Sequence, residues 1–239
     1  MGKGKNIKIF LGLIYALLML VFLWILLKNF SIQDFTSYEL IKANRDALEE
    51  IKNNNFFFMS IMFFLGTTIW VLLLGFGTPI VLVGGFIFGK WFGTLLTVFG
   101  LSFGATLLYI FANYFLKEII RDKFLSKFKN LENKFKKSEF NYLLLYRFIG
   151  GVPWQLSCVL PTIFNVKVKN FFLATLIGII PQVFLIVSIG AGLETIITNN
   201  LEVPKIADII KTKEIYIPLI IFACLVVTTI FLRKFFYKK

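Results

Sequence analysis

Residues 143–154 read LLLYRFIGGVPW, and this stretch decides how the surrounding chain folds. It is apolar apart from one cation, Arg147, and it ends in two glycines, a valine, a proline and a tryptophan. Proline removes a backbone donor and clashes with the preceding helical turn, so a helix that enters this stretch should break. A charge in an apolar run is costly and needs polar groups to hold it. We therefore predict a broken helical hairpin with an arginine near its tip.

The composition of the whole chain places this hairpin in a membrane. The 239 residues are 58% hydrophobic and only 16% charged, far from the norm for soluble globular proteins. A membrane-spanning helix needs about 20 apolar residues. We therefore predict an all-α polytopic membrane protein with about four transmembrane helices plus two re-entrant hairpins. Uncharged stretches of sufficient length lie at 9–27, 56–89, 91–116, 148–166, 170–193 and 215–232.

The stretch 56–89 is the second segment that should break. It is too long for a single span and contains several glycines and one proline, so its helix is expected to be interrupted inside the bilayer. The predicted breakpoints are Thr78-Pro79 and Gly84-Gly85, together with Phe88-Gly89.

The distribution of charge orients these segments. Basic side chains dominate 1–8, 117–141 and 233–239, whereas acidic side chains outnumber basic ones in 28–55 and 194–214. Loops rich in Lys and Arg stay on the cytoplasmic side. One crossing helix is enough to connect each outer loop with the neighbouring inner loop. The broken segment before that helix must therefore begin and end on the same side of the membrane. The first broken segment, 56–89, begins and ends on the outer side, and the second begins and ends on the inner side. The second, from about Tyr142 to Lys169, has about 26 residues, or roughly 20 Å per helical arm, which cannot cross a core of about 30 Å twice.

The two halves of the core thus form an inverted repeat, the architecture in which secondary transporters place a site at mid-depth. Gly100 and Gly104 in one long helix, and Ala174 and Gly178 in the other, allow close helix packing. We predict an N-terminal transmembrane helix at 1–30, an outer amphipathic segment at 31–55, a core at 56–193 made of hairpin 56–90, helix 91–116, basic cytoplasmic segment 117–141, hairpin 142–169 and helix 170–193, an outer loop at 194–214, and a C-terminal transmembrane helix with a basic tail at 215–239.

Catalysis has few residues to use in this chain. There is no histidine, which removes the commonest general base and zinc ligand. All 13 acidic residues fall in the predicted loops, so the apolar core offers no paired carboxylates and no carboxylate proton relay. Cys158 and Cys224 have no metal-binding or disulfide spacing. We expect no enzyme, no cofactor and no metal site, and a membrane-embedded lipid enzyme ranks third among the functions.

Arg147 is the charge best suited to bind a ligand. A guanidinium can bind a lipid phosphate through two parallel hydrogen bonds, or it can hydrogen-bond the free carbonyls of a broken hairpin. Both roles stay open and are compatible. Glycine and proline at the tips turn the chain, and backbone N–H groups exposed there also suit an anion. The predicted headgroup site comprises Arg147, Gly150, Gly151, Pro153, Trp154, Pro79, Gly84 and Gly85.

The segment 117–137 has an apolar stripe beside several lysines, which is typical of an amphipathic helix on the anionic inner leaflet. An ordinary cytoplasmic loop explains the charges equally well. The lysines expected to contact the membrane surface are Lys123, Lys127, Lys134, Lys136 and Lys137.

Two groups of residues carry a family resemblance. The first is PIVLVGGFIFG at 79–89, followed by Gly93, Gly104-Ala105 and Tyr109; the second is Arg147-x5-Pro153, followed by Phe171-x3-Thr175-x2-Gly178-x2-Pro181 and Gly190. Together they resemble the VTT domain of the SNARE-associated Golgi protein and DedA-like families, over roughly 56–193. The resemblance implies two opposed re-entrant hairpins and the movement of phospholipids or polyprenyl phosphates between leaflets. The first hairpin has no acidic residue, so the resemblance does not extend to the functional acidic residues of DedA-like members.

Two functions from different classes follow from these observations. The leading one is a lipid translocase or scramblase that acts in membrane homeostasis; the alternative is a non-transporting membrane organiser or tether that docks partners through 117–137. Because the charges lie in short segments between apolar runs, we expect membrane lipids as partners, anionic ones above all, and no nucleic acid. A homo-oligomer is compatible with the sequence. The expected location is a bacterial inner (plasma) membrane, with both termini cytoplasmic.

Overall fold

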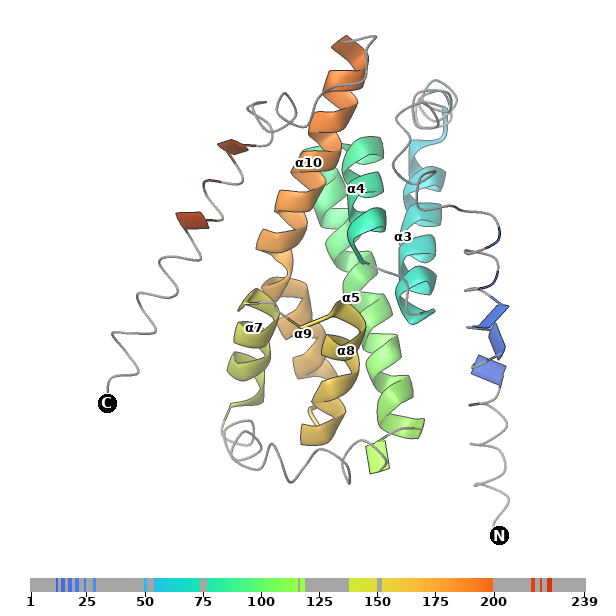
Figure 1. Ribbon diagram of the computed structural model, residues 1–239, viewed down its shortest axis with the longest axis vertical. Coiled ribbons are helices and arrows are strands. Elements are labelled where there is room, and N and C mark those ends of the chain that lie inside the picture. Colours follow the sequence, from blue (N-terminus) through green and yellow to red (C-terminus); the bar gives the residue numbers. More distant parts are fainter. Residues whose placement is uncertain are drawn as a thin grey trace.

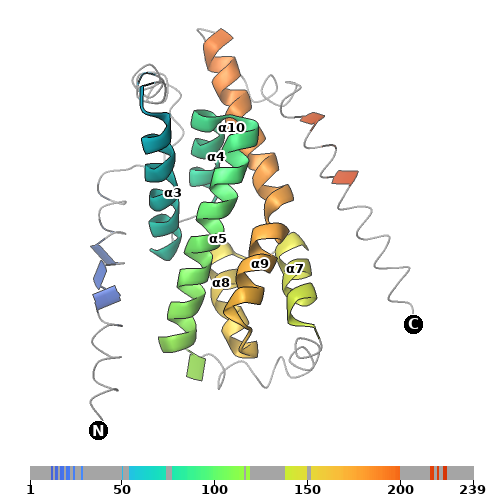
Figure 2. The ribbon, with the colours of Figure 1, turned by 180° about the vertical axis from the view of Figure 1, so that it is seen from behind.

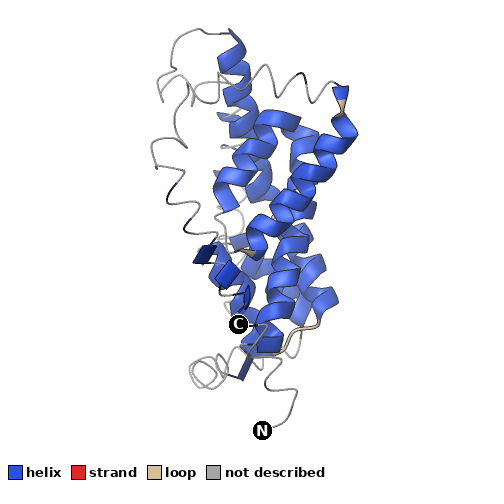
Figure 3. Cartoon of the chain, turned by 90° about the vertical axis from the view of Figure 1, so that its right-hand side faces the viewer, coloured by secondary structure: helices blue, strands red, loops and turns tan. Residues whose placement is uncertain are grey.

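The computed structural model describes residues 54–73, 77–115, 117–118, 138–149 and 152–199, with residue 50 and scattered positions in 12–28 and 216–224. All regular structure in these residues is helical, which confirms the all-α class for the described part of the chain (Figure 3). The elements are α3 (Phe56–Leu72), α4 (Gly77–Phe88), α5 (Lys90–Phe115), α7 (Glu139–Ile149), α8 (Trp154–Val159), a 3₁₀ turn (Leu160–Phe164), α9 (Val168–Gly178) and α10 (Ile180–Asn199).

The helices form two groups that run in opposite directions. In Figure 1, α3 descends to mid-height, α4 returns upward, and α5 then descends over nearly the whole height. The second group inverts this path: α7 rises to mid-height, α8 and the 3₁₀ turn lead back down, and α9 with α10 rises to the top (Figures 1 and 2). The chain therefore contains two opposed helical hairpins, each followed by a long helical element. That these hairpins enter a membrane without crossing it stays a prediction.

One helix among the described residues, α5, is long and apolar enough to cross a membrane by itself. The pair α9 and α10 qualifies only together, because the two helices meet at an angle of 45°. The predicted helix 170–193 is therefore divided into two helices that meet at a bend. Pro181 lies at the start of α10 and cannot continue the hydrogen bonding of α9, so the helix breaks at Ile179. The helix also continues to Asn199, into the predicted outer loop 194–214.

The predicted break at Gly84-Gly85 is wrong. α4 runs without interruption from Gly77 to Phe88, and both glycines are buried inside it. The chain turns at Gly89, as predicted for Phe88-Gly89, and the φ of 72° at this residue favours glycine. Pro79 lies in the first turn of α4, where its missing N–H costs no hydrogen bond.

The two halves are interlocked by close backbone contacts. α3 packs on α5 and α7 packs on α9, but α4, the second arm of its hairpin, packs mainly on α10 of the other half. A Cβ at Gly85 would collide with the carbonyl of Val187 in α10, and one at Gly190 would collide with the carbonyl of Leu82 in α4. Only glycine permits this approach, so α4 and α10 form a rigid seam between the halves.

A repeated contact relates the two halves. A Cβ at Gly104 would lie 2.7 Å from Cβ of Val71 and 2.8 Å from the carbonyl oxygen of Thr68. A Cβ at Gly178 would lie 2.6 Å from Cβ of Arg147 and 3.2 Å from the carbonyl oxygen of Leu144. In both cases the glycine faces a side chain of the neighbouring helix, together with the backbone carbonyl of the residue three positions before that side chain. Val71 therefore takes, in the first half, the place that Arg147 takes in the second.

The segments 1–30, 31–55, 117–141 and 215–239 lie wholly or mostly outside the described residues. One contact does link the first of them to the core: the hydroxyl of Tyr15 donates a hydrogen bond of 2.5 Å to the carbonyl of Leu72, at the end of α3.

Candidate functional site

Arg147 lies in the last turn of α7, near mid-height, and only 3% of it is exposed. Its Nε donates to Oγ1 of Thr175 at 3.1 Å, and its two terminal nitrogens donate to Oγ of Ser157 at 2.5 Å and to Sγ of Cys158 at 3.6 Å. These partners lie on α9 and α8. The guanidinium therefore ties three helices of the second half together.

Two aromatic rings also contact the guanidinium. Its central carbon lies 5.0 Å from the ring centre of Trp154 and 5.0 Å from that of Phe171. Cations are attracted to the electron-rich faces of such rings, most strongly away from water. The two rings thus add favourable contacts to the hydrogen bonds of Arg147.

No carboxylate accepts a hydrogen bond from Arg147 among the residues that the structure describes. Glu139, the acidic residue of the same helix, is occupied elsewhere: it accepts from Nδ2 of Asn170 at 2.8 Å and from the N–H of Lys167 at 3.2 Å. A buried charge is normally paired with an opposite charge. In the described part of the protein the positive charge of Arg147 is solvated only by neutral groups.

A small cavity of about 30 Å³ adjoins the guanidinium. Two donors that belong to residues lining the cavity, the hydroxyl of Tyr146 and Nε1 of Trp154, are buried and have no hydrogen-bond partner in the described structure. Such unpaired groups are uncommon in folded proteins and need an explanation. The volume is sufficient for a water molecule. The cavity is lined by Tyr146, Arg147, Val152, Trp154, Ser157 and Gln182.

Gln182 supports the same region from α10. Its Nε2 donates to the carbonyls of Arg147 and Phe148, at 2.9 Å each. These are among the last carbonyls of α7, which have no partner within their own helix. Gln182 therefore performs the carbonyl-binding role that the sequence left open for Arg147.

Tyr109 supports the site from α5. It is fully buried, donates a hydrogen bond of 2.6 Å to the carbonyl of Val166, and stacks on Phe171 with ring centres 4.4 Å apart and planes at 10°. Because Phe171 contacts the guanidinium of Arg147, the long helix of the first half braces the site in the second.

Two of the predicted headgroup residues, Arg147 and Trp154, come together in one cavity. Pro153 is exposed directly before α8, while Pro79, Gly84 and Gly85 belong to α4 and do not line the cavity. The first hairpin does reach the site through Gly77, where a Cβ would lie 3.9 Å from the Trp154 ring. Gly150, Gly151 and the membrane-surface lysines Lys123, Lys127, Lys134, Lys136 and Lys137 lie outside the described residues.

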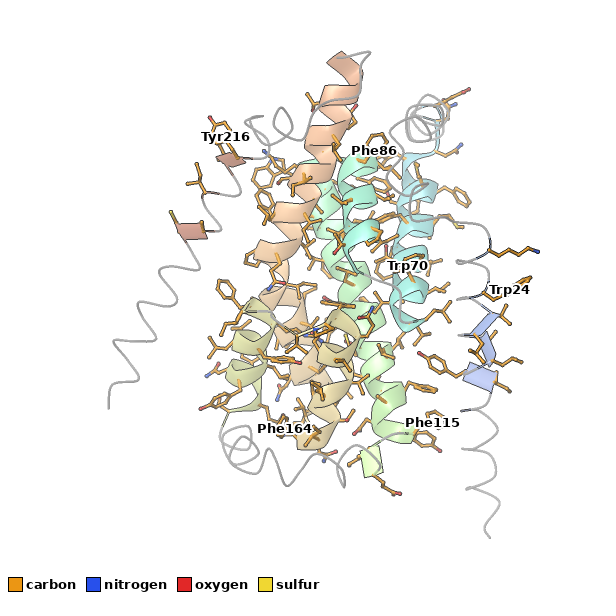
Figure 4. The ribbon with its side chains drawn as sticks, in the orientation of Figure 1. Trp24, Trp70, Phe86, Phe115, Phe164 and Tyr216 are labelled. Carbon is orange, nitrogen blue, oxygen red and sulfur yellow. The ribbon has the colours of Figure 1, made fainter. Side chains whose placement is uncertain are left out.

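Four polar residues of the site were missed by the sequence reasoning. Thr175 and Gln182 are polar side chains in the apolar stretch 170–193, and that contrast was a usable signal. Tyr146 and Ser157 were not distinguishable, because Tyr and Ser are common in membrane helices without any binding role. Figure 4 draws the described side chains, with Phe86 of α4 labelled above mid-height and Phe164 of the 3₁₀ turn labelled below it.

Known proteins match the part of the chain that contains this site. A family model described as the VTT domain matches residues 75–192. The chain is similar to a Transmembrane protein 41 homolog of Dictyostelium discoideum, with 26% identity over 168 residues, 67% of this chain and 49% of that protein. It is also similar to the uncharacterized protein YqeD of Bacillus subtilis (strain 168), with 30% identity over 112 residues, 46% of this chain and 54% of that protein.

A Transmembrane protein 41 homolog of Caenorhabditis elegans is 24% identical over 155 residues, which are 62% of each chain. The chain thus spans between 49% and 62% of the length of these curated relatives. No solved structure gives a significant match.

Proposed function

We propose that this chain, a membrane protein whose residues 75–192 belong to the VTT-domain family, moves phosphate-headed lipids between the two leaflets of its membrane. The family match confirms the resemblance read from the sequence motifs. Leaflet exchange itself, and a location in a bacterial inner membrane with cytoplasmic termini, are parts of the proposal.

The observation that carries the proposal is the buried charge of Arg147. A guanidinium has five N–H donors, of which three are used in hydrogen bonds to described residues and two have no described partner. Guanidinium and phosphate match in geometry as well as in charge. An oxyanion that reaches the cavity would supply the negative charge that the described surroundings of Arg147 lack.

The position of the site suits leaflet exchange. The headgroup is the part of a lipid that hydrocarbon excludes, and a cation halfway across lowers the cost of its passage. The acyl tails would stay in the bilayer, against an apolar stripe on α5 whose side chains are 39–56% exposed. The proposal needs no nucleotide, so exchange follows the gradient of the lipid. The stripe includes Leu95, Phe99, Phe103 and Leu107.

The decisive experiment measures leaflet exchange of a fluorescent phospholipid and a fluorescent polyprenyl phosphate in liposomes that contain the purified protein. We expect Arg147→Ala to slow exchange at least about tenfold, the factor set by one lost charge-assisted hydrogen bond. Lys169→Ala is the matched control, because it removes an exposed cation from α9 and should leave the rate unchanged. If the folded wild-type protein exchanges neither lipid, the proposal fails and the organiser function takes its place.

A further inference from the structure

We infer that Tyr15 of the N-terminal segment is a positioning residue: it holds the tip of the first hairpin beside the arginine site, in place of a donor that the long helix of the first half lacks. Tyr15 lies outside residues 75–192, the part of the chain that matches the VTT-domain model. Only the expected effect on leaflet exchange rests on the proposed function.

The first arms of the two hairpins end on equivalent carbonyls, and each carbonyl is bound by a side chain from another element. The last carbonyls of a helix have no partner within that helix, and hydrocarbon offers none. At the end of α7, Nε2 of Gln182 donates to the carbonyl of Phe148 at 2.9 Å. At the end of α3, the hydroxyl of Tyr15 donates to the carbonyl of Leu72 at 2.5 Å. Leu72 and Phe148 each directly follow the residue at the matched place of the two halves, so the two donors perform the same role.

The long helix of the first half cannot supply this donor itself. Gly104 and Gly178 are matched by their contacts, so Leu108, four residues after the first, takes the place of Gln182, four residues after the second. Leu108 is only 3% exposed, and its hydrocarbon side chain has no hydrogen-bond donor. Tyr15 therefore supplies from outside the repeat what the glutamine of α10 supplies within it.

The tip that Tyr15 contacts lies beside the arginine site. α3 ends at Leu72 and α4 begins at Gly77, where a Cβ would lie 3.9 Å from the ring of Trp154. The centre of the same ring lies 5.0 Å from the central carbon of the Arg147 guanidinium. A displacement of the tip would therefore remove support from a ring that contacts the buried charge.

The ring of Tyr15 has a contact of its own. It packs on Phe111 of α5, with ring centres 4.1 Å apart. Tyr15→Phe keeps this aromatic contact and deletes only the hydroxyl. The substitution thus tests the hydrogen bond to Leu72 separately from the packing of the N-terminal segment.

The experiment measures how fast a cysteine at the tip, Gly77→Cys, reacts with N-ethylmaleimide in the detergent-purified full chain. The background carries Cys158→Ser and Cys224→Ser, which remove the native thiols. We expect Tyr15→Phe to raise the reaction rate about fivefold, the factor that corresponds to one lost hydrogen bond. Ser60→Ala is the matched control and should leave the rate unchanged, because its hydroxyl donates to the carbonyl of Phe56 within α3.

Leu108→Gln provides a rescue that a general effect on stability would not produce. The new amide should reach the carbonyl of Leu72 as Gln182 reaches that of Phe148. The double variant Tyr15→Phe, Leu108→Gln should therefore react at the wild-type rate. A fold that Tyr15→Phe had merely loosened would not be repaired by a polar group buried at position 108.

Leaflet exchange, measured on the same variants without Gly77→Cys, should fall about fivefold in Tyr15→Phe and recover in the double variant. An unchanged thiol rate in Tyr15→Phe, an equal rise in Ser60→Ala, or no recovery in a folded double variant overturns the inference. If the double variant does not fold, the comparison of Tyr15→Phe with Ser60→Ala decides. Thiol rates as expected, in a protein that exchanges no lipid, would support the role of Tyr15 and refute the proposed function alone.

Discussion

At the scale of single residues, one arginine organises the second hairpin because its neighbours are polar but neutral. Thr175, Ser157 and Cys158 hold the guanidinium without cancelling its charge. The sequence predicted that Arg147 needs partners, since a cation in an apolar run is costly. It could not predict which groups bind, because those partners come from helices whose relative placement depends on tertiary packing.

Arg147→Lys tests the fork geometry directly. A lysine keeps the charge, but its single nitrogen cannot reach all three partners that the guanidinium contacts on α8 and α9. We expect leaflet exchange to fall about tenfold, as for Arg147→Ala, with a smaller loss of stability than the alanine variant shows. Exchange at the wild-type rate in a normally folded lysine variant would argue against phosphate binding through two parallel hydrogen bonds.

Gln182→Leu tests the support of the α7 carbonyls. The change keeps the approximate size of the side chain but leaves the carbonyls of Arg147 and Phe148 without their described donor. We expect a loss of about 1–3 kcal/mol in the free energy of unfolding, measured by titration with a denaturing detergent. Ser188→Ala is the control, because its hydroxyl bonds only within α10, to the carbonyl of Phe184; a loss as large as that of Gln182→Leu would refute the assignment.

At the scale of helices, the sequence predicted the breaks better than their positions. The hairpin breaks, α5 and the inverted order of the halves follow from glycine, proline and charge patterns. The bend at Ile179 and the continuity of α4 through Gly84-Gly85 do not. Glycine marks either a turn or a close helix contact, and only the partner helix decides which.

Gly85→Ala tests the seam between α4 and α10. A methyl group there would press on the carbonyl of Val187, so the helices must separate. We expect a loss of about 1–3 kcal/mol in the free energy of unfolding. Gly66→Ala in α3 is the matched control: a Cβ there meets nothing within 4 Å, and alanine favours a helix by up to about 1 kcal/mol. Similar effects of the two substitutions would be incompatible with the seam.

Two substitutions at Tyr109 test how α5 supports the arginine site. Tyr109→Phe keeps the stack on Phe171 and loses the hydrogen bond to Val166, so we expect a loss of stability of about 1 kcal/mol and nearly normal exchange. Tyr109→Leu also removes the stack, and should lower both stability and exchange further. An exchange rate that falls equally in both variants would assign the effect to the hydrogen bond rather than to the ring.

At the scale of the whole molecule, the two hairpins open toward opposite ends. The start of α7 and the start of α9 lie at one end, and the start of α3 lies at the other (Figure 1). If the membrane normal follows the long axis, both ends of the second hairpin face one compartment. This is the arrangement that the charge pattern predicted.

Single cysteines test this topology in cells. In a background with Cys158→Ala and Cys224→Ser, we expect Ser138→Cys and Lys169→Cys to react with a membrane-impermeant thiol reagent only after the cytoplasm is opened to it. Asn55→Cys, at the start of α3, should react from outside in intact cells. Labelling of positions 138 and 169 from different compartments would mean that the second hairpin crosses the membrane.

The place in the first half that corresponds to Arg147 is occupied by Val71, which has no charge, and this difference has a consequence for inhibition. Under the proposed function, an amphiphile that enters along the second hairpin would meet a cation near mid-height, whereas the matching place in the first hairpin holds a buried hydrocarbon side chain. Equal lipid concentrations still give equal fluxes in both directions, because a passive path has no preferred sense. A bulky phosphate analogue that cannot cross the bilayer should nevertheless block exchange only when it is added to the compartment that the second hairpin faces, so inhibition would be one-sided although passive exchange is not.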